Sequence, residues 1–220
     1  SNAGSAKFVG GSNTEIAYNY LEEEFSKDFG YSNSKELAAG VVGNAMAESG
    51  PNMDPMAYNP GGGGRGANGI IQWRGARLKA MQVFAQSNNL QMTENAGGNP
   101  VPGLEGQLAF LVHELKTEKW LRFADWAPRS RTVESAADNF ERFVEISHPE
   151  VPKTASYEER VQKVPSLKKR IDNAVGVYNE YNYSTKNKSD GEDNTQGGNK
   201  KTNTSSTGVK YDEFGDQVSD

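Results

Sequence analysis

One helix that has to end abruptly constrains this 220-residue chain more than any other feature. Leu37, Val41 and Ala45 repeat at steps of four, which predicts a helix with an apolar face. Ser49-Gly50-Pro51 follows at once, and a glycine with a proline after it is typical of a helix end. Glu48 is therefore expected in the last turn of this helix, close to its apolar face.

A carboxyl in that position is under two influences that favour its protonated form. Apolar surroundings disfavour a charge, and the negative end of the helix dipole disfavours a negative charge again. A carboxyl that keeps its proton near neutral pH suits a general acid. The other interpretation of Glu48 is a carboxylate that caps a neighbour or pairs with an arginine. The segment that follows it favours the catalytic interpretation.

That segment contains the glycine-rich stretch Asn59-Pro60-Gly61-Gly62-Gly63-Gly64-Arg65-Gly66. Four successive glycines disfavour a helix or a regular strand because they lose much backbone entropy, so we expect a loop that approaches a ligand closely. The loop leads into Gly69-Ile70-Ile71-Gln72-Trp73, whose amide and indole suit the hydroxyls and apolar faces of a sugar. The predicted substrate-binding residues beside the loop are Tyr58, Asn59, Gln72 and Trp73, whereas Trp120 and Trp126 are assigned to the core.

Three segments together resemble the phage-tail lysozyme family, which belongs to the wider lysozyme and lytic-transglycosylase fold group. They are Gly40 to Gly50 (GVVGNAMAESG), Asn59, and Gly69 to Trp73, and the looser resemblance covers about Thr14 to Tyr181. The resemblance implies a lysozyme-like domain that cleaves the glycan strand of peptidoglycan, with Glu48 as the acid and Asn44 as a further substrate-binding residue. It also implies action outside the cell, at the cell wall or in a virion tail, as a muramidase or endolysin without a cofactor.

The second carboxylate of the site is left open by the sequence. A hydrolase needs a base about 6.5–9.5 Å from the acid or a nucleophile about 5–5.5 Å from it. The candidates are Asp54, Glu114, Glu141 and Glu145. A lytic transglycosylase uses one glutamate as acid and then as base, and forms anhydro ends. Both enzymes remain open, as does a non-catalytic wall-binding or tail-structural module.

The helical periodicity predicts a mostly α domain with a small irregular or hairpin region, at Met56 to Trp73, that lines a cleft. Ser12, Asn33 and Thr132 are predicted N-caps, and Pro165 is predicted to kink or split the last helix. We expect a tag remnant and flexible lead at 1–11 and the catalytic domain at 12–183. A flexible polar linker at 184–220 would lead toward a further domain, or to a phage-tail or conjugation assembly, because 184–207 has no large apolar residue.

Composition excludes several other classes. The net charge of −5 gives no argument for nucleic acid, and no apolar run is long enough to predict a membrane span. The chain has no cysteine and two histidines, so we expect no disulfide and no metal site. Gly61, Gly63 and Gly66 match a dinucleotide-binding pattern formally, but the strand and helix that this pattern requires are not predicted beside it.

Overall fold

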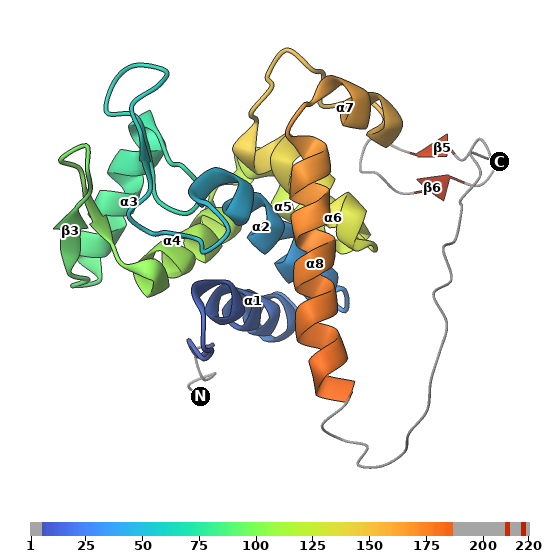
Figure 1. Ribbon diagram of the computed structural model, residues 1–220, viewed down its shortest axis with the longest axis horizontal. Coiled ribbons are helices and arrows are strands. Elements are labelled where there is room, and N and C mark those ends of the chain that lie inside the picture. Colours follow the sequence, from blue (N-terminus) through green and yellow to red (C-terminus); the bar gives the residue numbers. More distant parts are fainter. Residues whose placement is uncertain (1–5, 187–209, 212–216, 219–220) are drawn as a thin grey trace.

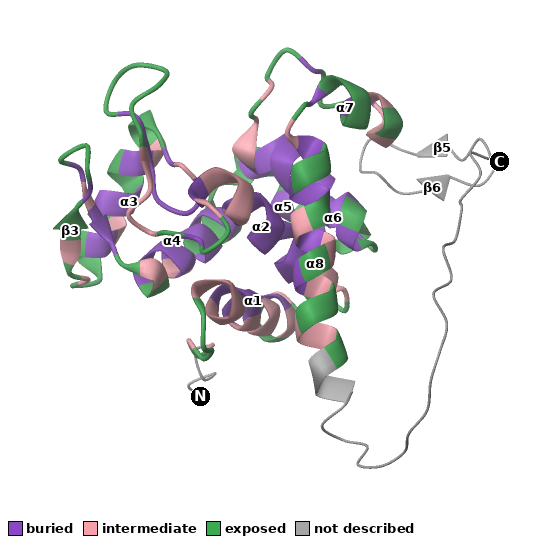
Figure 2. Cartoon of the chain, viewed as in Figure 1, coloured by how far each residue is buried: buried purple, intermediate pink, exposed green. Residues whose placement is uncertain are grey.

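Helix α2 (Ser34–Ser49) lies at the centre of the fold, and α1 (Asn13–Glu23), α6 (Val133–Phe140) and α8 (Leu167–Lys186) pack against it (Figure 1). The structure is a computed structural model that describes residues 6–186, 210–211 and 217–218. Most side chains of α2 are buried, as the purple colouring of Figure 2 shows. A helix covered in this way belongs to the core of a domain.

Two glycines of α2 let its neighbours approach closely. A Cβ atom on Gly40 would lie 2.7 Å from the backbone of Ala136 in α6. A Cβ atom on Gly43 would lie 2.6 Å from the backbone of Ala174 in α8. Interiors are packed too tightly to yield at such distances, so only glycine permits these two helix contacts. The contacts set the position of α2, and with it the position of Glu48 in the last turn.

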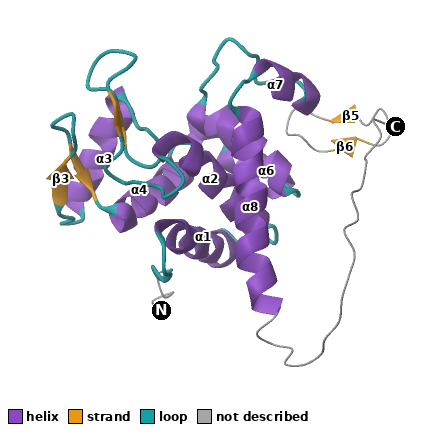
Figure 3. Cartoon of the chain, viewed as in Figure 1, coloured by secondary structure: helices purple, strands orange, loops and turns teal. Residues whose placement is uncertain are grey.

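A second group of elements lies beside this helical centre (Figures 1 and 3). It contains α3 (Gly75–Ser87), α4 (Leu104–Thr117) and two antiparallel hairpins. The first hairpin pairs β1 (Tyr58–Asn59) with β2 (Ala67–Asn68), which confirms the hairpin predicted around the glycine loop. The second pairs β3 (Met92–Glu94) with β4 (Pro100–Pro102), in a segment for which the sequence predicted no hairpin. A buried amide network joins them, because Asn68 Oδ1 accepts hydrogen bonds from Asn95 and Asn99.

Short helical elements complete the domain. The domain as a whole is mostly helical, which confirms the predicted mostly α class. Pro165 splits the last helical region into α7 (Tyr157–Lys163) and α8, as expected for a residue that cannot donate a helical hydrogen bond. The other short elements are α5 (Phe123–Trp126), the 3₁₀ turns η2 (Lys119–Leu121) and η3 (Ala127–Arg129), and the π-helical turns η1 (Glu24–Asp28) and η4 (Glu141–Glu145).

Two of the three predicted helix caps are present. Ser12 Oγ accepts a hydrogen bond from a backbone N–H in the first turn of α1, and Thr132 forms a reciprocal capping box at the start of α6. Asn33 does not cap α2 with its side chain. Its Nδ2 instead donates to the carbonyls of Ala127 and Ser130, nearly a hundred residues away in the sequence. Tertiary hydrogen bonds therefore replace the predicted local one at that helix.

The ends of the domain differ from the predicted boundaries. Residues 6–11, predicted to be a loose lead, lie against α1, where Phe8 stacks on Tyr20 with ring centroids 4.3 Å apart. Helix α8 continues to Lys186, past the predicted start of the linker at 184. Within the predicted linker, β5 (Lys210–Tyr211) pairs with β6 (Gln217–Val218). The remainder of that predicted linker and residues 1–5 lie outside the described residues.

Candidate active site

Glu48 is the penultimate residue of α2, as the sequence predicted. The helix ends after Ser49, whose hydroxyl donates to the carbonyl of Ala45, and Gly50 follows with φ +94°. That backbone conformation is one that glycine adopts without a steric penalty. The Glu48 side chain is 18 % exposed, so it is partly accessible from the surface of the domain. A partly exposed carboxyl of this kind can reach a ligand.

An arginine from the last helix holds the Glu48 carboxyl. Arg170 of α8 donates from Nη2 to Glu48 Oε1 at 2.5 Å, and its own side chain is 5 % exposed. The same guanidinium donates to Asn44 Oδ1 at 3.1 Å and to Ser166 Oγ at 3.0 Å. Glu48 therefore does not lie in the apolar surroundings predicted for it, because a buried arginine faces its carboxyl.

Glu145 is the candidate carboxyl whose pKa responds to the charge of Glu48. It ends η4, and its Oε1 is inaccessible to solvent and has no hydrogen-bond partner. Burial raises the pKa of Glu145 well above its ordinary value, and the nearby negative charge of Glu48 raises it further. Arg170 and Arg77 act in the opposite direction with smaller effect. Burial and the charge of Glu48 thus both favour the protonated form of Glu145 over its carboxylate.

The other three candidates have partners of their own. Glu114 receives two hydrogen bonds from Arg77, and its Oε1 also accepts from the indole of Trp73. Glu141 is buried and bonds to Arg160 and to Ser147. Both carboxylates therefore belong to ion pairs inside the domain, and breaking such a pair is strongly destabilising.

Asp54 is exposed, and its Oδ1 accepts the backbone N–H of Met56 in a local turn. That bond is of a common turn-forming type and does not link Asp54 to Glu48. The candidate that the structure brings into electrostatic contact with Glu48 is therefore Glu145.

Two predicted substrate-binding residues lie in the core instead. Asn44 is fully buried, and its Nδ2 donates to the carbonyls of Gly40 and Ala137. Trp73 is 1 % exposed and packs edge-on against Phe110. Neither side chain can offer its surface to a sugar, so the prediction of direct contact is contradicted at both positions. Asn44 supports Arg170 and Trp73 supports Glu114, each through a hydrogen bond.

The remaining predicted residues shape the loops beside the first hairpin. Gln72 has φ +60°, and its Nε2 donates to the carbonyls of Gly69 and Ala57. Asn59 is exposed, and its Oδ1 accepts the N–H of Gly61 at the start of the glycine loop. Tyr58 is half-buried under the two hairpins. Gln72 thus fixes the turn that connects α2 with β1, and contact of these residues with substrate stays a prediction.

The phage tail lysozyme family profile matches residues 12–181. The chain belongs to the phage tail lysozyme family. No curated protein and no solved structure gave a significant match. Membership suggests peptidoglycan-lytic activity at the cell wall or in a virion tail. None of the helices in the described part of the chain has the length and apolar character that a membrane span requires.

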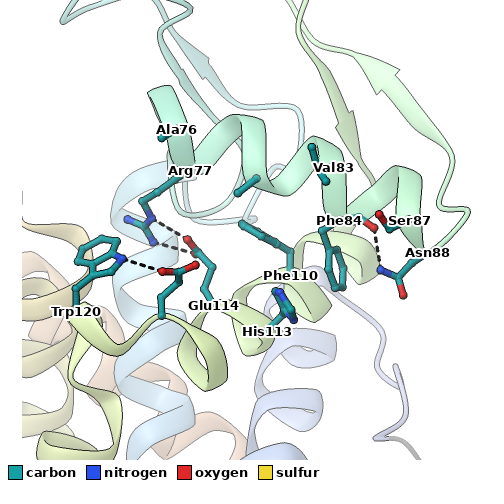
Figure 4. Close-up of a pocket in the computed structure, with 12 residues that line it drawn as sticks. Ala76, Arg77, Val83, Phe84, Ser87, Asn88, Phe110, His113, Glu114 and Trp120 are labelled. Atoms are coloured by element: carbon teal, nitrogen blue, oxygen red, sulfur yellow. Dashed lines mark hydrogen bonds and ion pairs between the residues drawn. The ribbon is translucent and has the colours of Figure 1, made fainter.

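This phage tail lysozyme domain also has a hollow of about 630 Å³ between α3 and α4 (Figure 4). Phe84, Phe110 and His113 line one part of it, and Trp120 lines the other. Trp120 is 47 % exposed, which corrects its predicted place in the core, whereas Trp126 is fully buried as predicted. The lining includes neither Glu48 nor Glu145.

Sequence reasoning did not find Arg170, although a weak signal for it exists. Leu167, Ile171 and Ala174 repeat along the buried face of α8, and Arg170 adjoins that face in the sequence. A basic residue beside an apolar stripe is often an exposed side chain with a buried stem, so the pattern by itself is weak. Its partner Glu48 lies 122 residues earlier, and only the packing of α8 on α2 joins them.

Proposed function

We propose that the protein cleaves the glycan strand of peptidoglycan at the bond between N-acetylmuramic acid and N-acetylglucosamine, with Glu48 as the general acid. The observation that carries this proposal is the position of Glu48. Its side chain is partly exposed at the end of the central helix, and its carboxyl accepts a hydrogen bond from Arg170. The family membership supports the substrate class.

In the proposed reaction, the protonated Glu48 donates its proton to the bridging oxygen while the bond from that oxygen to the sugar carbon breaks. The oxygen has to come within about 2.6–3.2 Å of the carboxyl for this transfer. The hydrogen bond from Arg170 holds the Glu48 carboxyl in one orientation.

We infer that the substrate lies against the turn that joins α2 to the first hairpin. Gln72 organises this turn through the Ala57 carbonyl, and Asn59 organises the glycine loop through Gly61. Glycines at 62, 63 and 64 have positive φ and carry no side chains, so a ligand can approach their backbone closely. Backbone N–H groups can donate to hydroxyl or N-acetyl oxygens of a sugar.

The test of the acid is Glu48→Gln, which preserves shape and the acceptor for Arg170 but carries no acidic proton. We expect wall-lytic activity, followed as loss of turbidity of purified cell walls, to fall by about 100-fold or more. A melting curve would establish that the variant is folded. Substantial lysis by a folded Glu48→Gln protein would remove Glu48 from the mechanism.

A lytic transglycosylase is the second candidate. Glu114 and Glu141 are engaged in internal ion pairs, and the Oε1 of Glu145 is inaccessible to solvent, so these three offer no open carboxylate base for a water molecule. A mechanism with one working glutamate accommodates that arrangement. Mass spectrometry of the released muropeptides separates the two reactions: reducing ends assign hydrolysis, and anhydro ends assign transglycosylation.

A non-catalytic wall-binding or tail-structural module is the third possibility. The wild-type protein would then bind cell walls without releasing any soluble muropeptide, and Glu48→Gln would bind equally well. The proposed setting is the cell wall or a virion tail, with attachment to a phage-tail or conjugation assembly through the C-terminal segment. Co-purification of the full chain with such an assembly would test that setting.

A further inference from the structure

A smaller cavity, of about 170 Å³, lies where η4 and α7 meet the segment that joins them. Its lining is rich in basic side chains, namely those of Arg142, His148, Lys153 and Arg160. Glu141 is the single carboxylate among the lining residues. Neither Glu48 nor Arg170 belongs to the lining, so this cavity is separate from the proposed acid.

A buried cluster of two arginines and two carboxylates forms the inner wall of the cavity. Asp138 of α6 accepts a hydrogen bond from Arg142 Nη2 at 2.7 Å and one from Arg160 Nε at 2.8 Å. Arg160 Nη2 bonds to one oxygen of Glu141, and Ser147 donates to the other. These four charged side chains are at most 2 % exposed. Each carboxylate therefore uses both of its oxygens within the protein.

Two cationic groups at the cavity keep donors that these carboxylates do not take up. Arg160 is buried, yet its Nη1 donates no hydrogen bond within the described part of the chain, whereas its Nε and Nη2 both do. Lys153 is exposed, and its ammonium forms no ion pair with a carboxylate of the described residues. Buried polar groups nearly always have a partner, so an unbonded guanidinium nitrogen beside a cavity indicates that something else fills it.

The charge of this region favours a negative ligand. Arg142, Arg160 and Lys153 supply three positive charges, and Asp138 and Glu141 supply two negative ones. Burial lowers the pKa of the Arg142 guanidinium; the charge of Asp138 opposes this shift, and the charge of Arg160 adds to it. An anion within a few ångströms would stabilise these cations.

The segment that carries Lys153 is fixed against the cluster. Arg142 Nη1 donates to the backbone carbonyl of Lys153 at 3.0 Å. Within the segment, the N–H of Val151 donates to the carbonyl of His148 at 3.0 Å. A cationic side chain on a backbone that is already held in place loses less entropy when it binds a ligand. The cavity is therefore organised before any ligand arrives.

We propose that this cavity binds a phosphate group, held by Arg160 Nη1 and the ammonium of Lys153. Its volume corresponds to about five water molecules, and a phosphate has five heavy atoms. A planar carboxylate is bound best by two parallel N–H groups of an arginine, but Nε and Nη2 of Arg160 already bond to Asp138 and Glu141. A single remaining N–H and the point charge of a lysine suit the tetrahedral oxygens of a phosphate.

The first experiment is calorimetric titration of the full chain with inorganic phosphate at constant ionic strength. We expect saturable binding of one phosphate per chain. At ten times the dissociation constant, the melting temperature should be higher by roughly 3–6 °C. Acetate, a planar carboxylate, should bind about tenfold more weakly or not at all. Absence of saturable phosphate binding, or equal affinity for acetate, would overturn the proposal.

The second experiment locates the binding with substitutions at exposed lysines, which preserve the buried cluster. Lys153→Gln should weaken phosphate binding about tenfold or more, whereas Lys153→Arg should retain most of it. Lys163→Gln is the matched control, because Lys163 lies on α7, pairs with Glu159 and does not line the cavity. Equal weakening by Lys153→Gln and Lys163→Gln would show a response to overall charge alone and would refute the site.

Glycerol 3-phosphate then separates two sources of the phosphate. An affinity similar to that of inorganic phosphate would show that the cavity accepts an esterified phosphate, such as one carried by a larger molecule. Binding of inorganic phosphate alone would assign the site to the free ion. Wall lysis enters neither experiment, so failure of this proposal would leave Glu48 as the proposed acid, and an active Glu48→Gln protein would leave the phosphate site standing.

Discussion

Replacing Glu145 by glutamine should stabilise the protein relative to wild type, and this difference should grow as the pH rises. The pKa of Glu145 is raised in the folded state, chiefly by burial, whereas in the unfolded chain it returns to about 4.3. Below that pH the carboxyl is protonated in both states, and the difference in stability between variant and wild type is constant. Above it, the unfolded wild-type chain releases the proton and the folded protein keeps it.

The unfolded wild-type chain is therefore stabilised by about 1.4 kcal/mol for each pH unit between the unfolded and the folded pKa. Wild type loses stability through this window as the pH rises, and Glu145→Gln does not share that loss. Over two pH units within the window, the variant should gain about 2.7 kcal/mol relative to wild type. For a domain of this size that gain corresponds to a melting temperature higher by roughly 5–10 °C.

Urea unfolding of both proteins from pH 4 upward measures this difference directly. The quantity to compare is the free energy of unfolding of the variant minus that of wild type at each pH. In this difference the titration of all groups that the two proteins share cancels. Glu150→Gln, at an exposed position, should show a difference that does not change with pH. If the difference for Glu145→Gln is equally flat, Glu145 has an ordinary pKa in the folded protein, and the reasoning about its burial fails.

Three further substitutions and one control substitution test the framework of the site. Arg170→Met should lower the free energy of unfolding by about 2–4 kcal/mol in urea, since it leaves buried acceptors unpaired. Gly43→Ala should lower the free energy of unfolding by about 1–3 kcal/mol, because its Cβ would overlap the backbone of Ala174. Gly176→Ala in α8 is the control: no neighbouring element lies within 4 Å of the new Cβ, so it should stabilise the protein by about 0.5–1 kcal/mol. Equal effects of the two would contradict the close helix contact. Gln72→Ala should reduce wall lysis and also lower the melting temperature by a few degrees, because the two side-chain hydrogen bonds that hold this turn are lost; an unchanged rate would remove Gln72 from the substrate site.

Local chemistry made much of the fold predictable. Thr132 caps α6, Pro165 separates α7 from α8, and the helix that carries Glu48 ends at Ser49-Gly50-Pro51, each for a reason contained within a few residues. The glycine loop was also predictable, since four successive glycines disfavour a helix or a regular strand. The hairpin around it was expected as well. The hairpin of β3 and β4 was not predictable, because its strands are three residues each and two of the three residues of β4 are prolines.

The sequence by itself determined where Glu48 lies on its helix and which family the motif around it resembles. Only the tertiary structure decided what faces that carboxyl. Arg170 stands 122 residues further along the chain, and it meets Glu48 because Gly43 lets α8 pack closely on α2. The charge on a carboxyl depends on burial and on charges within a few ångströms, and those neighbours are set by helix packing rather than by local periodicity.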